Sequence, residues 1–123
     1  MPERDQIDLY VGSVVIDVND LDLMTNFWKE VLVYDVDLKR EHWAKLVDPN
    51  ERRATVALQK VPEKRTEKNR LHIDLYSKHP TVEIERVLGL GASHVHGPRE
   101  DEDFVVLADP EGNLFCVIDK TST

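Results

Sequence analysis

The sequence predicts an α+β domain made of two similar units, each a strand, a helix and then two or three further strands. Two observations predict this class. First, residues 10–18 and 71–76 have strand patterns, and each stretch is followed by a polar break and a helical apolar pattern. Second, an Asp-Pro turn follows each helical pattern, at Asp48-Pro49 and at Asp109-Pro110. The recurrence of strand, helix and turn indicates two copies of one structural unit.

The first unit begins with residues 10–18, which are rich in β-branched side chains and therefore favour a strand. Asp20 is a predicted N-cap, because a short acidic side chain can accept hydrogen bonds from the first free amides of a helix. An apolar stripe at helical spacing follows, formed by Met24, Phe27, Trp28, Val31 and Leu32. Strands are then expected over residues 42–47 and 54–61, with a turn at residues 48–50 between them.

The second unit repeats this order. Residues 71–76 alternate apolar and polar side chains, which is the period of a strand. Ile84, Val87 and Leu88 form the next helical stripe, and Gly91 suits the position just past a helix, where a positive φ is needed. Residues 104–119 predict two strands around a turn at their centre.

The two units span about residues 8–61 and 70–119, so residues 1–123 are predicted to form one domain. Residues 62–69 join the units. This segment shows no periodicity, and the wider stretch around it is basic. It is interpreted either as a solvated linker or as a mobile basic flap over an acidic ligand.

Composition excludes several classes of function. The net charge of −8 argues against nucleic acid or an anionic membrane as the main partner, because both select positively charged surfaces. The single cysteine, Cys116, excludes an internal disulfide and a zinc site with several cysteines. No apolar run approaches the roughly 18 residues of a membrane span, and the charged N-terminus does not resemble a signal peptide. A cytoplasmic protein is therefore expected.

Alternation along the strands predicts a polar site. If the β-branched and aromatic side chains pack on the helices, the other strand face gathers small polar groups. A fully solvated face would carry more lysine and glutamate, so this mixed face is typical of a partly enclosed cavity. Trp43 and Phe104 are candidates to line its walls. The polar members of this face are Ser13, Gln59, His72, Asp74, Tyr76 and Cys116.

These features resemble the vicinal-oxygen-chelate superfamily, which includes glyoxalase I, extradiol dioxygenases, and bleomycin and fosfomycin resistance proteins. The paired units, the strand at residues 72–75 and the turn at residues 109–113 carry the resemblance. Small bacterial glyoxalase-like domain proteins are the most similar group, through Asp20, Phe27-Trp28, Trp43, residues 59–64, residues 69–75, Gly91-Ala92 and residues 104–116. The resemblance implies paired βαβββ modules that form a curved, cup-like mixed sheet with the helices outside. It also implies a ligand or metal inside the cup and a homodimer.

The resemblance further implies four metal-ligand positions, which fall on Ser13, Gln59, His72 and Cys116. A serine hydroxyl is a poor ligand for a first-row divalent ion. A cysteine thiolate can bind zinc, but hard octahedral ions prefer oxygen ligands. No cofactor is therefore expected. If a divalent metal does bind, the expected ligands are Gln59, His72 and Cys116.

Three functions stay open. The first is a small-molecule-binding protein whose acidic charge favours a cationic ligand. The second is a lyase, isomerase or dioxygenase of the vicinal-oxygen-chelate type, with His72 and Asp74 as catalytic residues; Ser13 and Cys116 disfavour its metal-dependent version. The third is a structural or regulatory module whose own side chains fill the cup. The predicted ligand pocket comprises Ser13, Trp43, Gln59, His72, Asp74, Phe104 and Cys116.

Overall fold

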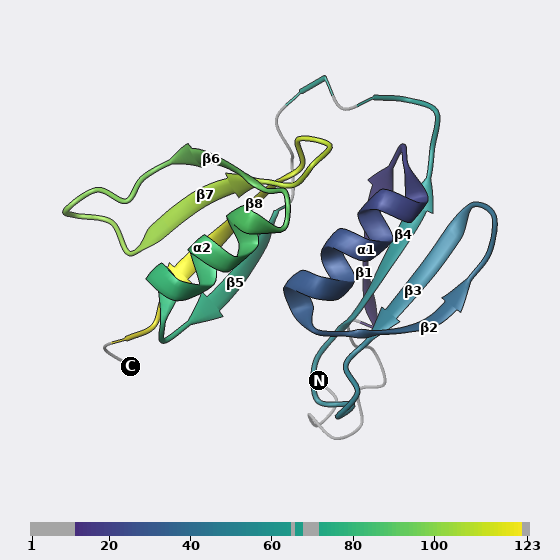
Figure 1. Ribbon diagram of the computed structural model, residues 1–123, viewed down its shortest axis with the longest axis horizontal. Coiled ribbons are helices and arrows are strands. Elements are labelled where there is room, and N and C mark those ends of the chain that lie inside the picture. The colour runs from purple at the N-terminus through teal and green to yellow at the C-terminus, as the bar shows by residue number, and fades with distance from the viewer. Residues whose placement is uncertain (1–11, 65, 68–71, 122–123) are drawn as a thin grey trace, which may run out of the picture.

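The computed structural model describes residues 12–64, 66–67 and 72–121 (Figure 1). Two modules lie side by side. Module A contains β1 (Ser13–Val18), α1 (Leu21–Leu32), β2 (Asp35–Lys39), β3 (Trp43–Val47) and β4 (Thr55–Lys60). Module B contains β5 (Ile73–Ser77), α2 (Pro80–Gly89), β6 (Ser93–His96), β7 (Phe104–Ala108) and β8 (Leu114–Asp119). Residues 10, 11 and 71 of the predicted strands, and residues 65, 68 and 69 of the predicted linker, lie outside the described residues.

Each module forms an open four-stranded mixed sheet. The strand orders are β1-β4-β3-β2 in sheet A and β5-β8-β7-β6 in sheet B. Strand β1 runs parallel to β4 in sheet A, and β5 runs parallel to β8 in sheet B. The remaining neighbours are antiparallel. The identical orders confirm the paired βαβββ architecture.

The Asp-Pro turns show the repeat at the level of single hydrogen bonds. Asp48 accepts from the backbone amides of Asn50 and Arg52, which lie two and four positions later. Asp109 accepts from the amides of Glu111 and Asn113 at the same offsets. Both aspartates are buried, so each carboxylate satisfies turn amides that would otherwise lack partners.

The helix ends follow the sequence signals. The Asp20 side chain accepts from the amide of Leu23 at 3.0 Å, which confirms it as the N-cap of α1. Helix α2 ends at Gly89, and Gly91 then adopts a φ of +123°. Glycine tolerates this backbone conformation because it has no Cβ.

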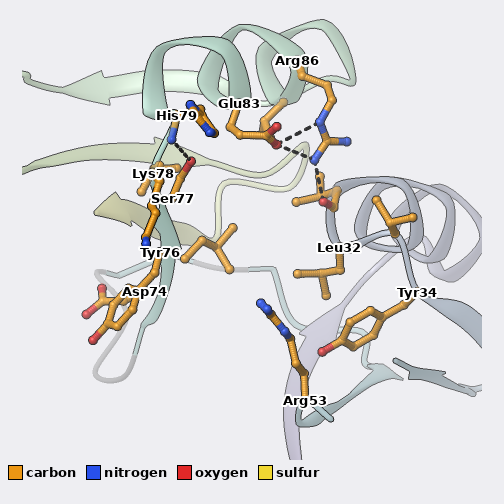
Figure 2. Close-up of a pocket in the computed structure, with 15 residues that line it drawn as sticks. Leu32, Tyr34, Arg53, Asp74, Tyr76, Ser77, Lys78, His79, Glu83 and Arg86 are labelled. Carbon is orange, nitrogen blue, oxygen red and sulfur yellow. Dashed lines mark hydrogen bonds and ion pairs between the residues drawn. The ribbon is translucent and has the colours of Figure 1, made fainter. Parts of the chain in front are cut away.

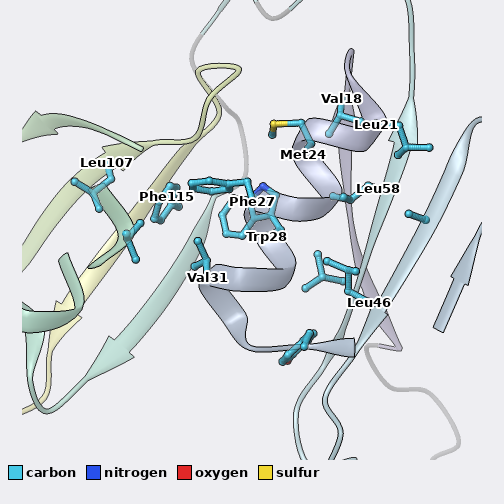
Figure 3. Packing of buried hydrophobic residues seen from close by; sticks show 14 of the residues in the cluster. Val18, Leu21, Met24, Phe27, Trp28, Val31, Leu46, Leu58, Leu107 and Phe115 are labelled. Atoms are coloured by element: carbon cyan, nitrogen blue, oxygen red, sulfur yellow. The ribbon is translucent and has the colours of Figure 1, made fainter. Parts of the chain in front are cut away.

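One hydrophobic core holds both modules together (Figure 3). On one side of α1, side chains pack with Val18, Leu46 and Leu58 of sheet A. On the other side, Trp28 meets the ring of Phe115 in β8, with ring centroids 5.1 Å apart. Helix α1 therefore lies between the two sheets and packs against both.

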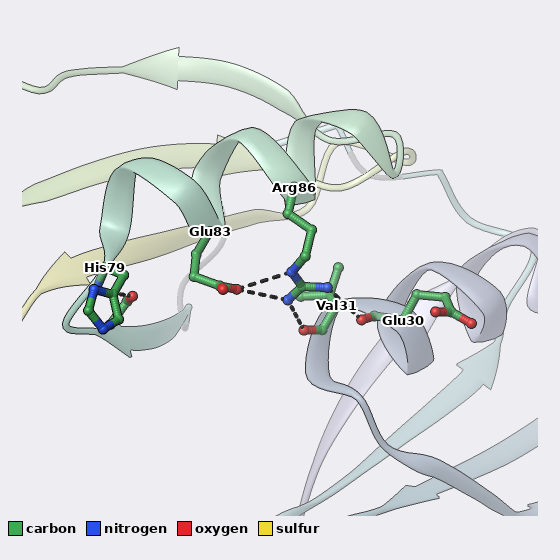
Figure 4. A network of polar contacts seen from close by, with 6 residues as sticks. Glu30, Val31, His79, Glu83 and Arg86 are labelled. Carbon is green, nitrogen blue, oxygen red and sulfur yellow. Dashed lines mark hydrogen bonds and ion pairs between the residues drawn. The ribbon is translucent and has the colours of Figure 1, made fainter.

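Two polar contacts reinforce this junction. The indole Nε1 of Trp28 donates to the buried carboxylate of Asp109 at 3.2 Å. The guanidinium of Arg86 in α2 donates to the carbonyl oxygens of Glu30 and Val31 at the end of α1, and it also pairs with Glu83 (Figure 4). The two bonds from Arg86 to α1 satisfy carbonyl groups at the helix end that have no partner inside the helix.

Candidate functional site

A hollow of about 350 Å³ lies on the face of sheet B that points away from the core. Strand alternation produces it, because Phe115 and Val117 turn inward while Cys116 between them turns outward. The hollow is lined by His72, Asp74, Phe104, Val106, Leu114, Cys116 and Ile118. Four of these side chains are apolar and the other three are polar.

The three polar side chains of the hollow converge. The parallel register of β5 and β8 places Asp74 directly opposite Cys116. Nε2 of His72, just before β5, lies 3.2 Å from Oδ1 of Asp74. One ligand atom from each of His72, Asp74 and Cys116 lies within 4.8 Å of the others. This set is called the donor cluster below.

Electrostatics keep the thiol of the donor cluster protonated. Burial raises the pKa of Cys116 above its ordinary value, and the charge of Asp74 and a hydrogen bond to it raise this pKa further. Cys116 is therefore a hydrogen-bond donor to Asp74 in neutral solution. A protonated thiol is a weak nucleophile, so the arrangement does not favour covalent catalysis by Cys116.

The donor cluster has two chemical capacities. The Asp74 carboxylate can accept a hydrogen bond or hold a cationic group of a ligand, and it can act as a general base. Imidazole, carboxylate and thiolate are also all metal ligands. The cluster sits at the edge of an apolar floor, an arrangement that suits a small molecule with one polar end.

A second hollow, of about 440 Å³, lies between the modules. It is lined by residues 13–17 of β1 and by the start of β5 and β8. Ser13 and His72 both line it, so the structure brings together two of the four positions that the resemblance implied. The other two do not share a hollow with both of these residues, since Cys116 lines only the sheet B hollow and Gln59 lines neither of the two.

The predicted polar face is therefore divided between two sheets. Trp43 and Gln59 stand opposite each other in β3 and β4, and they line neither hollow that contains His72. Phe104 lines the sheet B hollow, whereas Tyr76 is 68% exposed and its ring contacts the Nζ of Lys120. The alternation of β7 and β8 also identifies Val106, Leu114 and Ile118, which the predicted pocket omits.

A larger cleft, of about 620 Å³, lies between the end of α1 and the outer edge of β5 (Figure 2). The side chains of Arg53 and Tyr34 reach toward it from module A, and Glu83 and Arg86 from module B. Arg86 is already bound to Glu83 and to the end of α1. The cleft has mixed charge and shares only Asp74 with the predicted pocket, so the sheet B hollow is the stronger candidate.

Within the described ranges, no helix is long and apolar enough to cross a membrane. A family model described as a glyoxalase-like domain matches residues 13–118. No curated protein matches the sequence.

Solved structures share the fold at low sequence identity. A glyoxalase/bleomycin resistance protein/dioxygenase family enzyme from Burkholderia phytofirmans is 19% identical with a TM-score of 0.70, covering 89% of this chain and 97% of that one. A variant of the fosfomycin resistance protein FosX from Listeria monocytogenes, complexed with Mn(II) and a dihydroxypropylphosphonic acid, is 16% identical with a TM-score of 0.73. It covers 95% of this chain and 92% of its own. FosX from Mesorhizobium loti is 19% identical with a TM-score of 0.72, covering 94% of this chain and 95% of that one.

Proposed function

We propose that this chain, which belongs to the family of glyoxalase-like domains in the vicinal-oxygen-chelate superfamily, binds a small molecule in the sheet B hollow. One observation carries the proposal. Three polar groups converge at one end of a floor that is otherwise apolar. Small-molecule sites combine a mainly apolar lining with a few converging polar groups in this way.

The lining indicates the chemistry of the ligand. Phe104, Val106, Leu114 and Ile118 offer an apolar surface for the body of the molecule. At the polar end, Asp74 offers a carboxylate that attracts a cation or accepts a hydrogen bond. The net charge of −8 adds a long-range attraction for cations. The proposed ligand is a small molecule with an apolar or aromatic body and a cationic or donor group.

A homodimer is part of this proposal. In the described part of the chain, β1 and β5 are outermost strands that pair along one edge only. Val14 and Val15 of β1 are 37% and 47% exposed, so this edge strand offers apolar surface that a partner can cover. A second copy that covers β1 would bury them. It would also place a wall beside the hollow that contains Ser13 and His72.

Catalysis is the alternative function. The pairing of His72 with Asp74 favours catalysis, because the imidazole can orient the Asp74 carboxylate while that carboxylate takes a proton from a bound substrate. Manganese, which the FosX neighbour binds, does not fit the residues here. Hard ions of that kind prefer oxygen, whereas the donor cluster has one carboxylate, an imidazole and a thiol. The third reading, a filled cup, gains no support from a 350 Å³ hollow.

Three aromatic probes of equal shape test the ligand class: benzamidine, benzamide and benzoate. A half-exposed carboxylate attracts a cation about 4 Å away by about 1 kcal/mol, which is about fivefold in Kd. We expect benzamidine to bind at least about fivefold more tightly than benzamide, and benzoate to bind most weakly. Asp74→Asn should remove the preference for benzamidine. Calorimetric titration measures all three affinities.

A second pair of variants tests the location. Val106→Trp places an indole in the hollow and should abolish benzamidine binding. Val95→Trp is the matched control, since Val95 is exposed on β6 and does not line the hollow. Equal benzamidine affinity in both variants would contradict the proposed site.

A further inference from the structure

The ring of Phe104 forms part of the wall of the sheet B hollow, and a second ring lies against it. The imidazole of His96 in β6 is stacked on this ring, with centroids 5.9 Å apart and an angle of 26° between the planes. Phe104 lines the hollow, whereas His96 does not. The aromatic wall therefore has a support that is not itself part of the surface offered to a ligand.

The order of the strands explains this placement. In sheet B, β7 lies between β8 and β6, and His96 of β6 stands opposite Val106 of β7. Residues that stand opposite each other in neighbouring strands point to the same face of the sheet. Since Val106 lines the hollow, His96 lies on the hollow face as well, one strand further from Cys116 of β8. Phe104 in β7 therefore stands between the imidazole and the hollow.

Glu102 holds the imidazole in this place. Nε2 of His96 donates to Oε1 of Glu102 at 3.0 Å, and Oε2 lies 3.3 Å away. The two side chains are 31% and 21% exposed, which makes them the most buried pair of a histidine and a carboxylate in the described part of the chain. A half-buried pair is screened less by water and salt than an exposed one, so it keeps the imidazole more firmly in one orientation.

The loop that carries Glu102 is fixed at both ends. It begins at Gly97, whose φ is +81°, and a Cβ at this position would lie 3.0 Å from the carbonyl oxygen of Phe104. Glycine allows so close an approach because it has no Cβ. The loop ends at Asp103, whose carbonyl oxygen accepts from the amide of Asp119 at 2.7 Å. The carboxylate of Glu102 therefore comes from a short segment that is anchored on both β7 and β8.

We propose that His96 is a positioning residue of the sheet B hollow, which holds the ring of Phe104 as a flat wall and thereby selects ligands with a planar, aromatic body. This inference rests on the proposed function and narrows its ligand class. Aromatic rings attract each other in stacked or edge-to-face arrangements, and a saturated ring of the same size lacks this attraction. A wall that is already fixed loses less freedom when a ligand stacks on it, so the support from His96 favours flat ligands in particular.

Two amidines test this preference. Benzamidine has a flat aromatic body, and cyclohexanecarboxamidine carries the same cationic group on a saturated ring. We expect the unaltered protein to bind benzamidine at least about threefold more tightly, because a pair of aromatic rings contributes about two- to tenfold in affinity. His96→Leu should lower this ratio at least about twofold. Calorimetric titration measures both affinities.

Three further variants separate positioning from a general loss of structure. His96→Phe keeps a ring against Phe104 and should restore the preference for benzamidine, whereas Glu102→Ala releases the imidazole and should reduce it. His42→Leu is the matched control. His42 also pairs with a carboxylate, that of Glu41 at 3.8 Å, but it lies between β2 and β3 of module A and does not line the hollow. Its replacement should leave the ratio of affinities unchanged.

The two rings can also be observed without a ligand. We expect nuclear Overhauser contacts between the imidazole protons of His96 and the ring protons of Phe104, and we expect Glu102→Ala to weaken them. Their absence in the unaltered protein would overturn the support of Phe104 by His96, and their persistence at full strength in Glu102→Ala would contradict the role of Glu102. The contacts in the unaltered protein can be measured even if a variant unfolds.

The binding results distinguish this inference from the proposed function. If neither amidine binds the unaltered protein, the proposed function fails and this inference fails with it. If both bind in the hollow but His96→Leu keeps the full preference for benzamidine, the inference alone is wrong. A preference that falls in His96→Leu and returns in His96→Phe supports both.

Discussion

Phe115→Ala should destabilise both modules at once, although Phe115 belongs to module B alone. Its ring is 1% exposed and packs against Trp28 and Phe27 of α1, with centroids 5.1 and 6.5 Å away. Deleting a buried phenylalanine ring costs about 3–5 kcal/mol, to which the aromatic pairs contribute. A domain of this size has a free energy of unfolding of about 5–15 kcal/mol, so the loss is a large share of the total.

Trp43 makes the assay specific. It lies in β3 of module A, whereas Trp28 contacts Phe115 of module B, so the fluorescence of Trp43 in a Trp28→Phe background reports unfolding of module A. Far-UV circular dichroism reports both modules. At a urea m-value of about 2 kcal/mol/M, Phe115→Ala should lower the midpoint by about 2 M in both signals. Leu23→Ala, at an exposed position of α1, should change stability by less than about 0.5 kcal/mol.

Independent modules would give a different result. The fluorescence midpoint would then stay where it is in the unaltered protein, while part of the circular dichroism signal moved to lower urea. That outcome would refute the shared core. Phe115→Leu is the milder second variant and should lose about 1 kcal/mol, because it keeps most of the apolar volume but removes the aromatic pairing.

The remaining predictions concern the thiol, the dimer, the turn and the helix end. Burial and Asp74 both raise the pKa of Cys116, so Asp74→Asn should lower this pKa. The pH–rate profile for alkylation of Cys116 by iodoacetamide should then move to lower pH in metal-free protein. An unmoved profile would contradict the contact between Asp74 and Cys116. Val15→Lys should weaken self-association at least about tenfold in sedimentation, whereas Val82→Lys on α2 should not. Burial raises the pKa of Asp109, so the folded state disfavours its charged form. As pH falls through this folded pKa, the free energy of unfolding of the unaltered protein should therefore rise relative to that of Asp109→Asn. A difference between the two proteins that stays constant with pH in urea unfolding would disprove this. Gly91→Ala should lower the free energy of unfolding by about 1 kcal/mol, since alanine is strained at a φ of +123°.

Local patterns predict most of the fold. Alternation correctly assigns Phe115 and Val117 to the core, and the Asp-Pro turns identify the repeat. Strand β2 is an element that the sequence analysis does not single out. Its five residues alternate polar and apolar side chains, but the alternation is short and most of the strand is exposed. Its place becomes evident only from its pairing with β3.

The site is harder to predict because it depends on register and packing between modules. Asp74 meets Cys116 because β5 and β8 pair in one register, which nothing in either strand specifies alone. Gln59 and His72 belong to different sheets that pack through α1, and the alternation within a strand carries no information about that packing. The homodimer and the cytoplasmic location stay predictions.

Mapping benzamidine on the protein by amide chemical shifts tests the central claim most directly. The shifts should concentrate on β5, β7 and β8 around Asp74 and Cys116, and Asp74→Asn should remove them. Shifts concentrated around Arg53 and Tyr34 in the cleft between the modules would contradict it, as would shifts that persist in Asp74→Asn.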